Sequence, residues 1–162
     1  MENEGYYSGN DSSVNLVVQR YEEMRSNNSS YFFDVDEFED LIEFYSEKNL
    51  SAKAFEVAEY AMQQHPQSAT LLLLTAQILL SMYRPQKALH YLKLAENIEP
   101  FNLDLHLSKA NAYSQLRKPE KAIANYAKAL IYADSSEKED ILLQMAFENE
   151  NRSRYDLAIA LL

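Results

Sequence analysis

Acidic side chains cluster near the front of the chain, on one stretch of helical periodicity. They are Asp36, Glu39, Asp40, Glu43 and Glu47. Three- and four-residue spacing places several of them on neighbouring helix faces, where paired carboxylates could hold a metal ion or do acid–base chemistry. Di-metal carboxylate sites in helical proteins add a histidine at Glu-x-x-His spacing, which does not occur in this sequence. We therefore interpret the cluster as a solvated acidic face and predict no metal site.

The other residues that could bind a metal or take part in catalysis are scattered along the chain. His65, His90 and His106 form no His-Glu-x-x-His pattern, and the sequence has no cysteine for a thiolate site or a disulfide. There is no nucleophile elbow and no glycine-rich phosphate loop. Most tyrosines fall at the helix-packing step, which favours a core role over base stacking. We predict no catalytic residue, no cofactor and a protein that is not an enzyme.

The negative charge belongs mostly to the front of the chain. The formal net charge is -10, and residues 1–48 carry twelve acidic and three basic side chains. A field of this sign repels phosphate backbones and anionic lipids. We therefore expect neither a nucleic acid nor a membrane surface as the partner.

Composition favours an all-α fold. The two glycines both precede the first predicted helix, and there are only four prolines. These are too few turn-forming residues for a β structure with many turns. The 47% apolar content is ample for a core. The chain opens without a basic and apolar leader, and no apolar run is long enough to span a bilayer, so we expect a cytoplasmic protein.

The centre of the chain repeats itself with a shift of 34 residues. The residues in register include Ala76 with Ala110, Pro85 with Pro119, Ala88 with Ala122, Leu92 with Tyr126, and Ala95 with Ala129. Small and large apolar residues thus recur at fixed places. A period in the thirties with two helical patterns per period is typical of an α-solenoid.

The same register divides the rest of the chain. We expect a loose arm over residues 1–12, a leading helix and turn over 13–30 that docks on the array, and an array over 31–162. Its predicted repeats cover about 35–68, 69–102, 103–138 and a truncated 139–162, because Ala158 falls under Ala54, Ala88 and Ala122 at spacings of 34, 34 and 36. The connection after the third repeat reads as two residues longer than the others.

The truncated repeat predicts an uncovered apolar end. Ala158, Ile159, Leu161 and Leu162 stand where a second helix is cut short. Solenoid ends normally need a cap. We therefore predict a possible homodimer through this C-terminal helix.

The repeat pattern resembles the tetratricopeptide repeat, whose loose consensus is W-x2-L-G-x2-Y, then A-x3-F, A and P. Leu72, Thr75, Ala76, Leu79, Ala88, Leu92, Ala95 and Pro100 occupy these positions in the second repeat. The resemblance covers about residues 35–162 and implies a right-handed α-solenoid of helix-turn-helix repeats. YFFDVDEFEDLIEFY followed by AEYAMQQHP is similar, more loosely, to cytoplasmic repeat proteins of Bacteroides-type bacteria.

The resemblance also implies a binding groove, because in that family the first helix of each pair lines the concave surface. The residues expected there are Asp36, Glu39, Glu43, Thr70, Leu73, Gln77, Asp104, Leu107, Asn111, Asp140, Leu143 and Phe147. Family members that hold chaperone carboxylates use Lys and Arg on this face, and this chain has neither there. An acidic entrance and an apolar floor favour a basic or amphipathic partner.

We therefore predict a protein-interaction scaffold that binds a peptide, helix or protein subunit in this groove. The alternative is a helical accessory domain of a larger multidomain enzyme whose catalytic part lies beyond Leu162. The sequence does not identify the partner.

Overall fold

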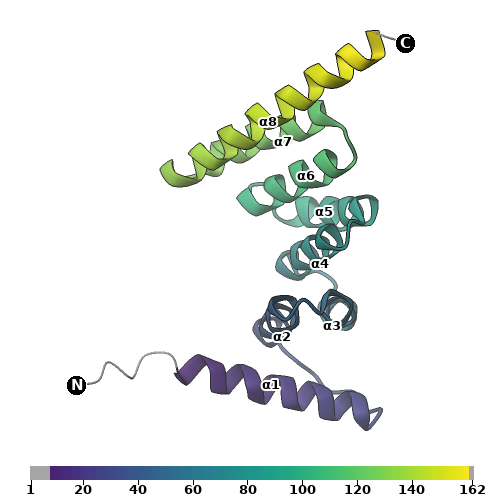
Figure 1. The fold of residues 1–162 in the computed structure, drawn as a ribbon. Helices are drawn as coiled ribbons and strands as arrows, with labels where there is room; N and C mark the ends of the chain where they lie inside the picture. The colour runs from purple at the N-terminus through teal and green to yellow at the C-terminus, as the bar shows by residue number, and fades with distance from the viewer. Residues whose placement is uncertain (1–7, 161–162) are drawn as a thin grey trace, which may run out of the picture.

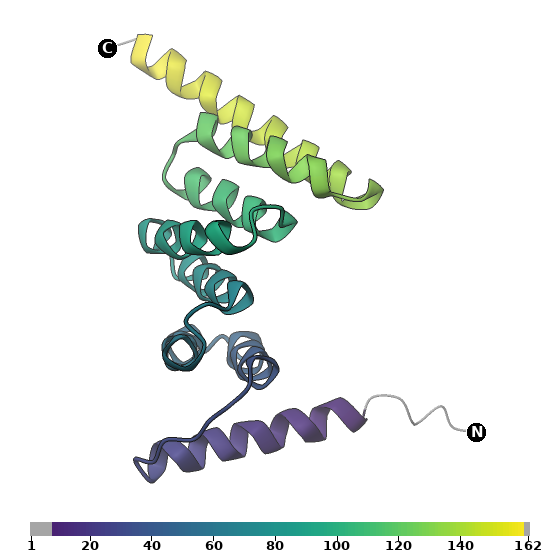
Figure 2. The same cartoon turned by 180° about the vertical axis from the view of Figure 1, so that it is seen from behind.

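The computed structural model describes residues 8–160, with side chains from residue 13 to residue 153. The described part forms eight α-helices that stack in a column, with α1 at one end and α8 at the other (Figures 1 and 2). Their bounds are α1 Ser8–Ser26, α2 Val35–Glu47, α3 Ser51–Gln64, α4 Ala69–Ser81, α5 Pro85–Ile98, α6 Leu103–Gln115, α7 Pro119–Tyr132 and α8 Ser135–Ala160. The predicted all-α solenoid is confirmed, and the bounds of α2 to α7 recur every 34 residues.

Local capping explains where the first helices of the repeats begin. The side chains of Asp34, Ser68 and Asn102 each accept a hydrogen bond from the backbone N–H three residues ahead, at 2.8, 3.3 and 3.0 Å. These bonds satisfy N–H groups that a helix start leaves without an intrahelical acceptor. In the first repeat, the Glu37 carboxylate also accepts from the Asp34 N–H at 2.9 Å, which completes a capping box.

The turns within the repeats share one backbone motif. Asn49, Tyr83 and Arg117 have φ angles of 58°, 54° and 54°, in the left-handed region. Each turn adds a hydrogen bond across six residues, as from the Arg84 N–H to the Leu79 carbonyl at 2.8 Å. This is the Schellman ending of an α-helix, which reverses the chain so that the second helix can pack on the first.

Small residues set the close approach of the paired helices. Ala54, Ala88 and Ala122 are completely buried on the second helices, and Ala76 and Ala110 are completely buried on the first helices. Around them lie the larger core residues, such as Leu72, Leu79 and Leu92 in the second repeat. A methyl side chain at the crossing lets two helix backbones approach more closely than a larger one would.

The leading helix α1 packs on the first repeat. Tyr21 and Met24 of α1 share one buried cluster with Phe33 and with Phe38 and Tyr45 of α2. The Tyr21 ring centre lies 6.0 Å from that of Phe33 and 6.4 Å from that of Tyr45. Burial raises the pKa of Tyr21 to about 12, so its hydroxyl stays neutral in the physiological range.

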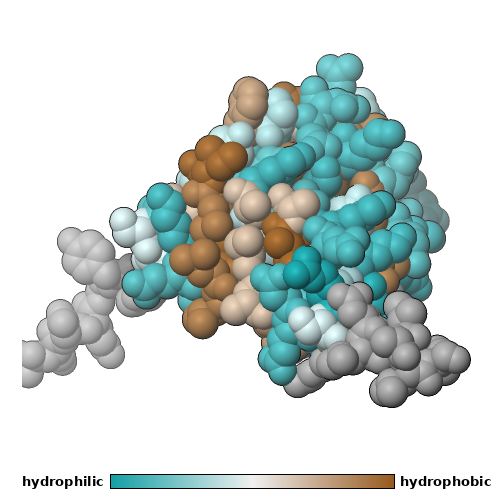
Figure 3. All heavy atoms as spheres, turned by 90° about the horizontal axis from the view of Figure 1, so that it is seen from above, coloured by the Kyte–Doolittle hydropathy of each residue, from teal (hydrophilic) through white to brown (hydrophobic). Residues whose placement is uncertain are grey.

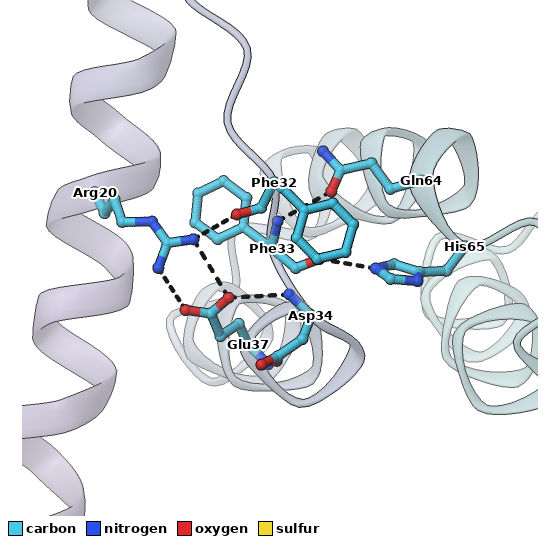
Figure 4. Close-up of polar contacts among 7 residues, drawn as sticks. All are labelled: Arg20, Phe32, Phe33, Asp34, Glu37, Gln64 and His65. Atoms are coloured by element: carbon cyan, nitrogen blue, oxygen red, sulfur yellow. Dashed lines mark hydrogen bonds and ion pairs between the residues drawn. The ribbon is translucent and has the colours of Figure 1, made fainter.

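Polar contacts fix the segment between α1 and α2 (Figure 4). Arg20 donates to the Glu37 carboxylate at 2.5 Å and to the Phe32 carbonyl at 2.5 Å, and its guanidinium lies 4.2 Å from the Phe33 ring centre. The Phe33 N–H donates to the Gln64 side chain at 3.0 Å. Because these partners come from α1, α2 and α3, the segment joins all three helices.

Two sequence predictions about the ends are wrong. Helix α1 begins at Ser8, inside the expected arm 1–12, because each residue added to a nucleated helix gains a backbone hydrogen bond whether or not it follows an apolar pattern. The connection before α8 is shorter than expected, because Asp134 caps a helix that begins at Ser135 and accepts from the Glu137 N–H at 2.9 Å. Residues 1–7, 161 and 162 and the side chains of Ala158 and Ile159 lie outside the described part.

The fourth repeat also differs from the prediction of a helix pair. Helix α8 is one continuous helix of 26 residues, Ser135–Ala160. A helix pair in this register would need a turn near residue 153, but the Ser153 hydroxyl donates to the Asn149 carbonyl at 3.1 Å, four residues back within the same helix. Without a left-handed residue at this position, the backbone continues its helical hydrogen bonding.

The packing predicts a sharp difference between two alanines. Ala110→Leu should lower the free energy of unfolding by about 1 to 3 kcal/mol, because Ala110 is fully buried at the α6–α7 crossing. The matched control Ala127→Leu makes the same change at an exposed position of α7 and should stay within about 0.5 kcal/mol. Urea unfolding would measure both. Equal unfolding free energies for the two variants would contradict the 34-residue register.

Candidate functional site

Two hollows lie side by side on the surface made by the first helices of the repeats. The α2–α4 hollow has a volume of about 450 Å³ and the α4–α6 hollow about 620 Å³. Gln77 and Ser81 of α4 line both, so the two form one groove, called here the first-helix groove. Helix α4 contacts both α2 and α6 directly, and the Gln115 side chain donates to the Leu80 carbonyl at 3.1 Å.

Seven of the twelve residues predicted for the groove line these hollows. They are Glu39, Glu43, Thr70, Gln77, Asp104, Leu107 and Asn111. Apolar floor residues include Ile42, Leu74 and Ile78, and no Lys or Arg lines either hollow among the described residues. The surface is acidic on α2 and mostly neutral on α4 and α6.

The remaining predicted residues lie elsewhere. Leu73 lines a smaller hollow of about 150 Å³ between α4, α5 and α6, so the apolar floor that was expected at Leu73 is supplied by Leu74. Asp36 is exposed near the start of α2. Asp140, Leu143 and Phe147 are exposed on α8 and line none of the three hollows.

Sequence reasoning missed the far end of the groove. Ser46, Ser81 and Gln115 extend the lining by one turn toward the helix C-termini, and Tyr83 stands at the rim with 83% of its surface exposed. The signal was available in the four-residue step from Gln77 to Ser81 and from Asn111 to Gln115. Tyr83 had no such signal in the sequence, because it lies in a turn and not on a helix face.

Glu39 lines the acidic end of the groove and has carboxylate neighbours. Partial burial raises the pKa of this carboxyl, and the neighbouring Asp36 and Asp40 raise it further. The same crowding that disfavours its negative charge makes the site favourable for a positive group. A cation placed between Glu39 and Glu43 therefore gains attraction from more than one carboxylate.

The three histidine side chains contact backbone carbonyls or aromatic rings within the fold. His65 Nε2 lies 2.7 Å from the Phe33 carbonyl, and His106 Nε2 lies 3.0 Å from the Pro100 carbonyl. The His106 ring also stacks on Tyr132 at 5.8 Å between ring centres. The His90 ring contacts its neighbour Tyr91 edge to face, at 5.6 Å.

The described part of the chain contains neither a cluster of metal-ligating side chains nor a membrane-spanning helix. Within it, no three His, Asp or Glu side chains come together as metal ligands. None of its helices combines the length and apolar character needed to cross a bilayer.

Comparison with known proteins identifies the architecture. No protein-family model matches the sequence, and no curated protein matches it. A crystal structure of the MamA protein superposes with a TM-score of 0.73 at 15% identity, covering 93% of this chain and 80% of that one. A thermophilic tetratricopeptide-repeat protein of Thermus thermophilus superposes at 0.67 and 20% identity, covering 93% and 90%.

A second MamA structure, of a point mutant, gives a TM-score of 0.63 at 18% identity and covers 93% of this chain and 89% of its own. Likeness at these identities shows the fold. The chain therefore has the right-handed tetratricopeptide-repeat fold that the resemblance of its repeats implied.

The surroundings of His106 predict a pH effect on stability. Burial lowers the pKa of His106, Lys128 and Lys109 lower it further, and the Pro100 hydrogen bond and Glu96 oppose the shift. A folded-state pKa below the unfolded value of about 6.5 means that stability is present above that pH and is lost as pH falls. His106→Phe should therefore lose less unfolding free energy than the wild type between pH 7.5 and 5.5.

Urea titrations at several pH values would measure this slope. The matched control is His90→Phe, at an exposed position of α5, which should keep the wild-type slope. A wild-type slope in His106→Phe would show that other groups cause the pH dependence.

Proposed function

We propose that the chain is a non-catalytic interaction scaffold that binds a basic or amphipathic segment of a partner protein in the first-helix groove. The observation that carries the proposal is the composition of the groove: Glu39 and Glu43 at one end, an apolar floor, and no lining Lys or Arg in the described part. Such a surface favours a segment with cationic side chains at one end and apolar anchors beyond them.

The groove is continuous across α2, α4 and α6, as a bound helix or extended peptide requires. Its two hollows together extend over three helices of successive repeats and share their lining on α4. An acidic segment would meet Glu39, Glu43 and Asp104, so like-charge repulsion disfavours it. The side-chain amides of Gln77 and Asn111 can donate and accept hydrogen bonds along a peptide backbone.

Reversing charge at the acidic end tests the electrostatic part of the proposal. A library of cationic amphipathic peptides and a charge-inverted library with the same apolar residues would be screened against the chain. Binders should come from the cationic library, and Glu39→Lys with Glu43→Lys should slow their association about tenfold at low salt. The difference should shrink near 1 M salt, where the screening length is about 3 Å.

The matched control reverses two exposed carboxylates away from the groove, Glu23→Lys on α1 and Glu59→Lys on α3. It changes the net charge equally and should leave association close to wild type. Selection of acidic binders, or equal effects of the two double variants, would contradict the proposed groove.

Tyr83 tests the apolar part of the proposal without weakening the fold. Tyr83→Gly removes an exposed ring from the rim of the α4–α6 hollow and suits the left-handed φ of 54°. Unfolding free energy should stay level or rise by up to about 1 kcal/mol. Peptide release should become faster by about tenfold, as for the loss of an aromatic anchor.

Arg117→Gly is the matched control, because it makes the same backbone change in the next turn and Arg117 lines none of the three hollows described above. It should change stability in the same direction and leave peptide release unchanged. Equal release rates for Tyr83→Gly and the wild type would exclude Tyr83 from the binding surface.

A further inference from the structure

Helix α8 keeps the register of a first helix, and its buried stripe shows this. Ile141 and Glu148 are buried, with 3% and 4% of their surfaces exposed. Counting back 36 residues places them on Leu105 and Ala112 of α6, which pack in one cluster with residues of the preceding repeat. Ile141 likewise joins the cluster of the third repeat, and Ser114 of α6 donates a hydrogen bond to Glu148.

The neighbouring stripe of α8 is uncovered. Leu142, Ala146 and Asn149 are exposed, whereas their equivalents on α4 are Leu72, Ala76 and Leu79, each at most 1% exposed. On α4 these residues pack in one cluster with Ala88 and Leu92 of α5, the second helix of the same repeat. No described residue takes that place on α8.

The uncovered stripe continues into a wider apolar face. Leu142, Leu143 and Phe147 are 54%, 68% and 56% exposed. Figure 3 looks onto this end of the column, and apolar side chains gather there in a band between hydrophilic areas. Exposure of several large apolar side chains on one helix marks an interaction surface.

The segment that should cover the stripe is carried away from it by its own helix. Residues 154–160 follow the second-helix pattern, with Ala158 in register with Ala122, yet their backbone continues α8. Residue 158 lies twelve residues beyond residue 146, about 18 Å along a straight helix axis. In the paired helices the equivalent alanines, Ala110 and Ala122, belong to one buried cluster.

We propose that a second copy of the chain covers this stripe, by exchange of the C-terminal half of α8. Residues 154–160 of each copy take the second-helix place beside Leu142 and Ala146 of the other, and the two α8 helices run antiparallel about a two-fold axis near residue 153. Both copies bury the same surface, as a closed symmetric exchange requires. Ser153 is the hinge, because the other turns have a left-handed residue at this register and Ser153 is helical.

The hinge predicts a change of oligomeric state from one substitution. Light scattering on the 162-residue chain over a concentration series should give twice the chain mass. Ser153→Gly should shift the population toward monomer, because glycine allows the left-handed turn that lets residues 154–160 fold back on their own helix. Ser153→Ala favours the continuous helix and should remain dimeric. A monomeric wild type, or equal masses for the two variants, would overturn the proposal.

Cross-linking tests the pairing itself, since the sequence has no cysteine. Ala146→Cys and Ala158→Cys chains of different tag length, mixed and oxidised, should form a disulfide-linked pair of unlike chains. Ala127→Cys mixed with Ala158→Cys is the control and should not. Disulfides form only where Cα atoms lie within about 7 Å, so equal yields in both mixtures would exclude this arrangement, as would a dimer that Leu142→Glu leaves intact.

Discussion

The close approach of two helices at buried alanines is the constraint on which this structure depends. Each repeat in such an array contacts only its neighbours, so the angle and spacing of one helix pair set the position of the next. A methyl group at Ala88 or Ala122 keeps the paired helices close, and residues such as Leu92 and Tyr126 fill the space beside the crossing. The groove follows from the same constraint, because regular stacking brings α2, α4 and α6 into contact and leaves hollows between them.

The acidity at the front of the chain has two separate uses in the structure. Glu22 and Glu37 form ion pairs with Lys53 and Arg20, and these pairs join α1 to α3 and α2. The contacts with Lys53 and Tyr45 lower the pKa of Glu22, so this docking weakens as pH falls toward the acid range. Glu39 and Glu43 instead line the α2–α4 hollow. Net charge alone could not have separated the two groups.

The sequence predicted the repeats well because their signals are local. Asp34, Ser68 and Asn102 cap helices at 34-residue spacing, and the buried alanines follow the same period. The groove was predicted only in part. Leu73 and Leu74 are adjacent and chemically alike, but adjacent side chains point about 100° apart around a helix. The apolar periodicity does not define the direction of a side chain this closely, so it could not tell which leucine lines the groove. The long-range contacts of Arg20 with Phe32 and Glu37 require the tertiary fold and had no local signal.

In α8, the 36-residue shift aligns residues with the earlier repeats, yet the second helix predicted from that alignment does not form as a separate element. The 36-residue shift is supported by Ile141 and Glu148, which occupy the stripe that faces the preceding repeat. A second helix requires in addition a turn, and a turn depends on one backbone conformation that Ser153 does not adopt. Helical continuation at this residue keeps the backbone hydrogen bonding of α8 but leaves Leu142 and Ala146 exposed. Local backbone energy and burial of the apolar stripe thus favour different arrangements within one chain, and association of two chains is an arrangement that satisfies both.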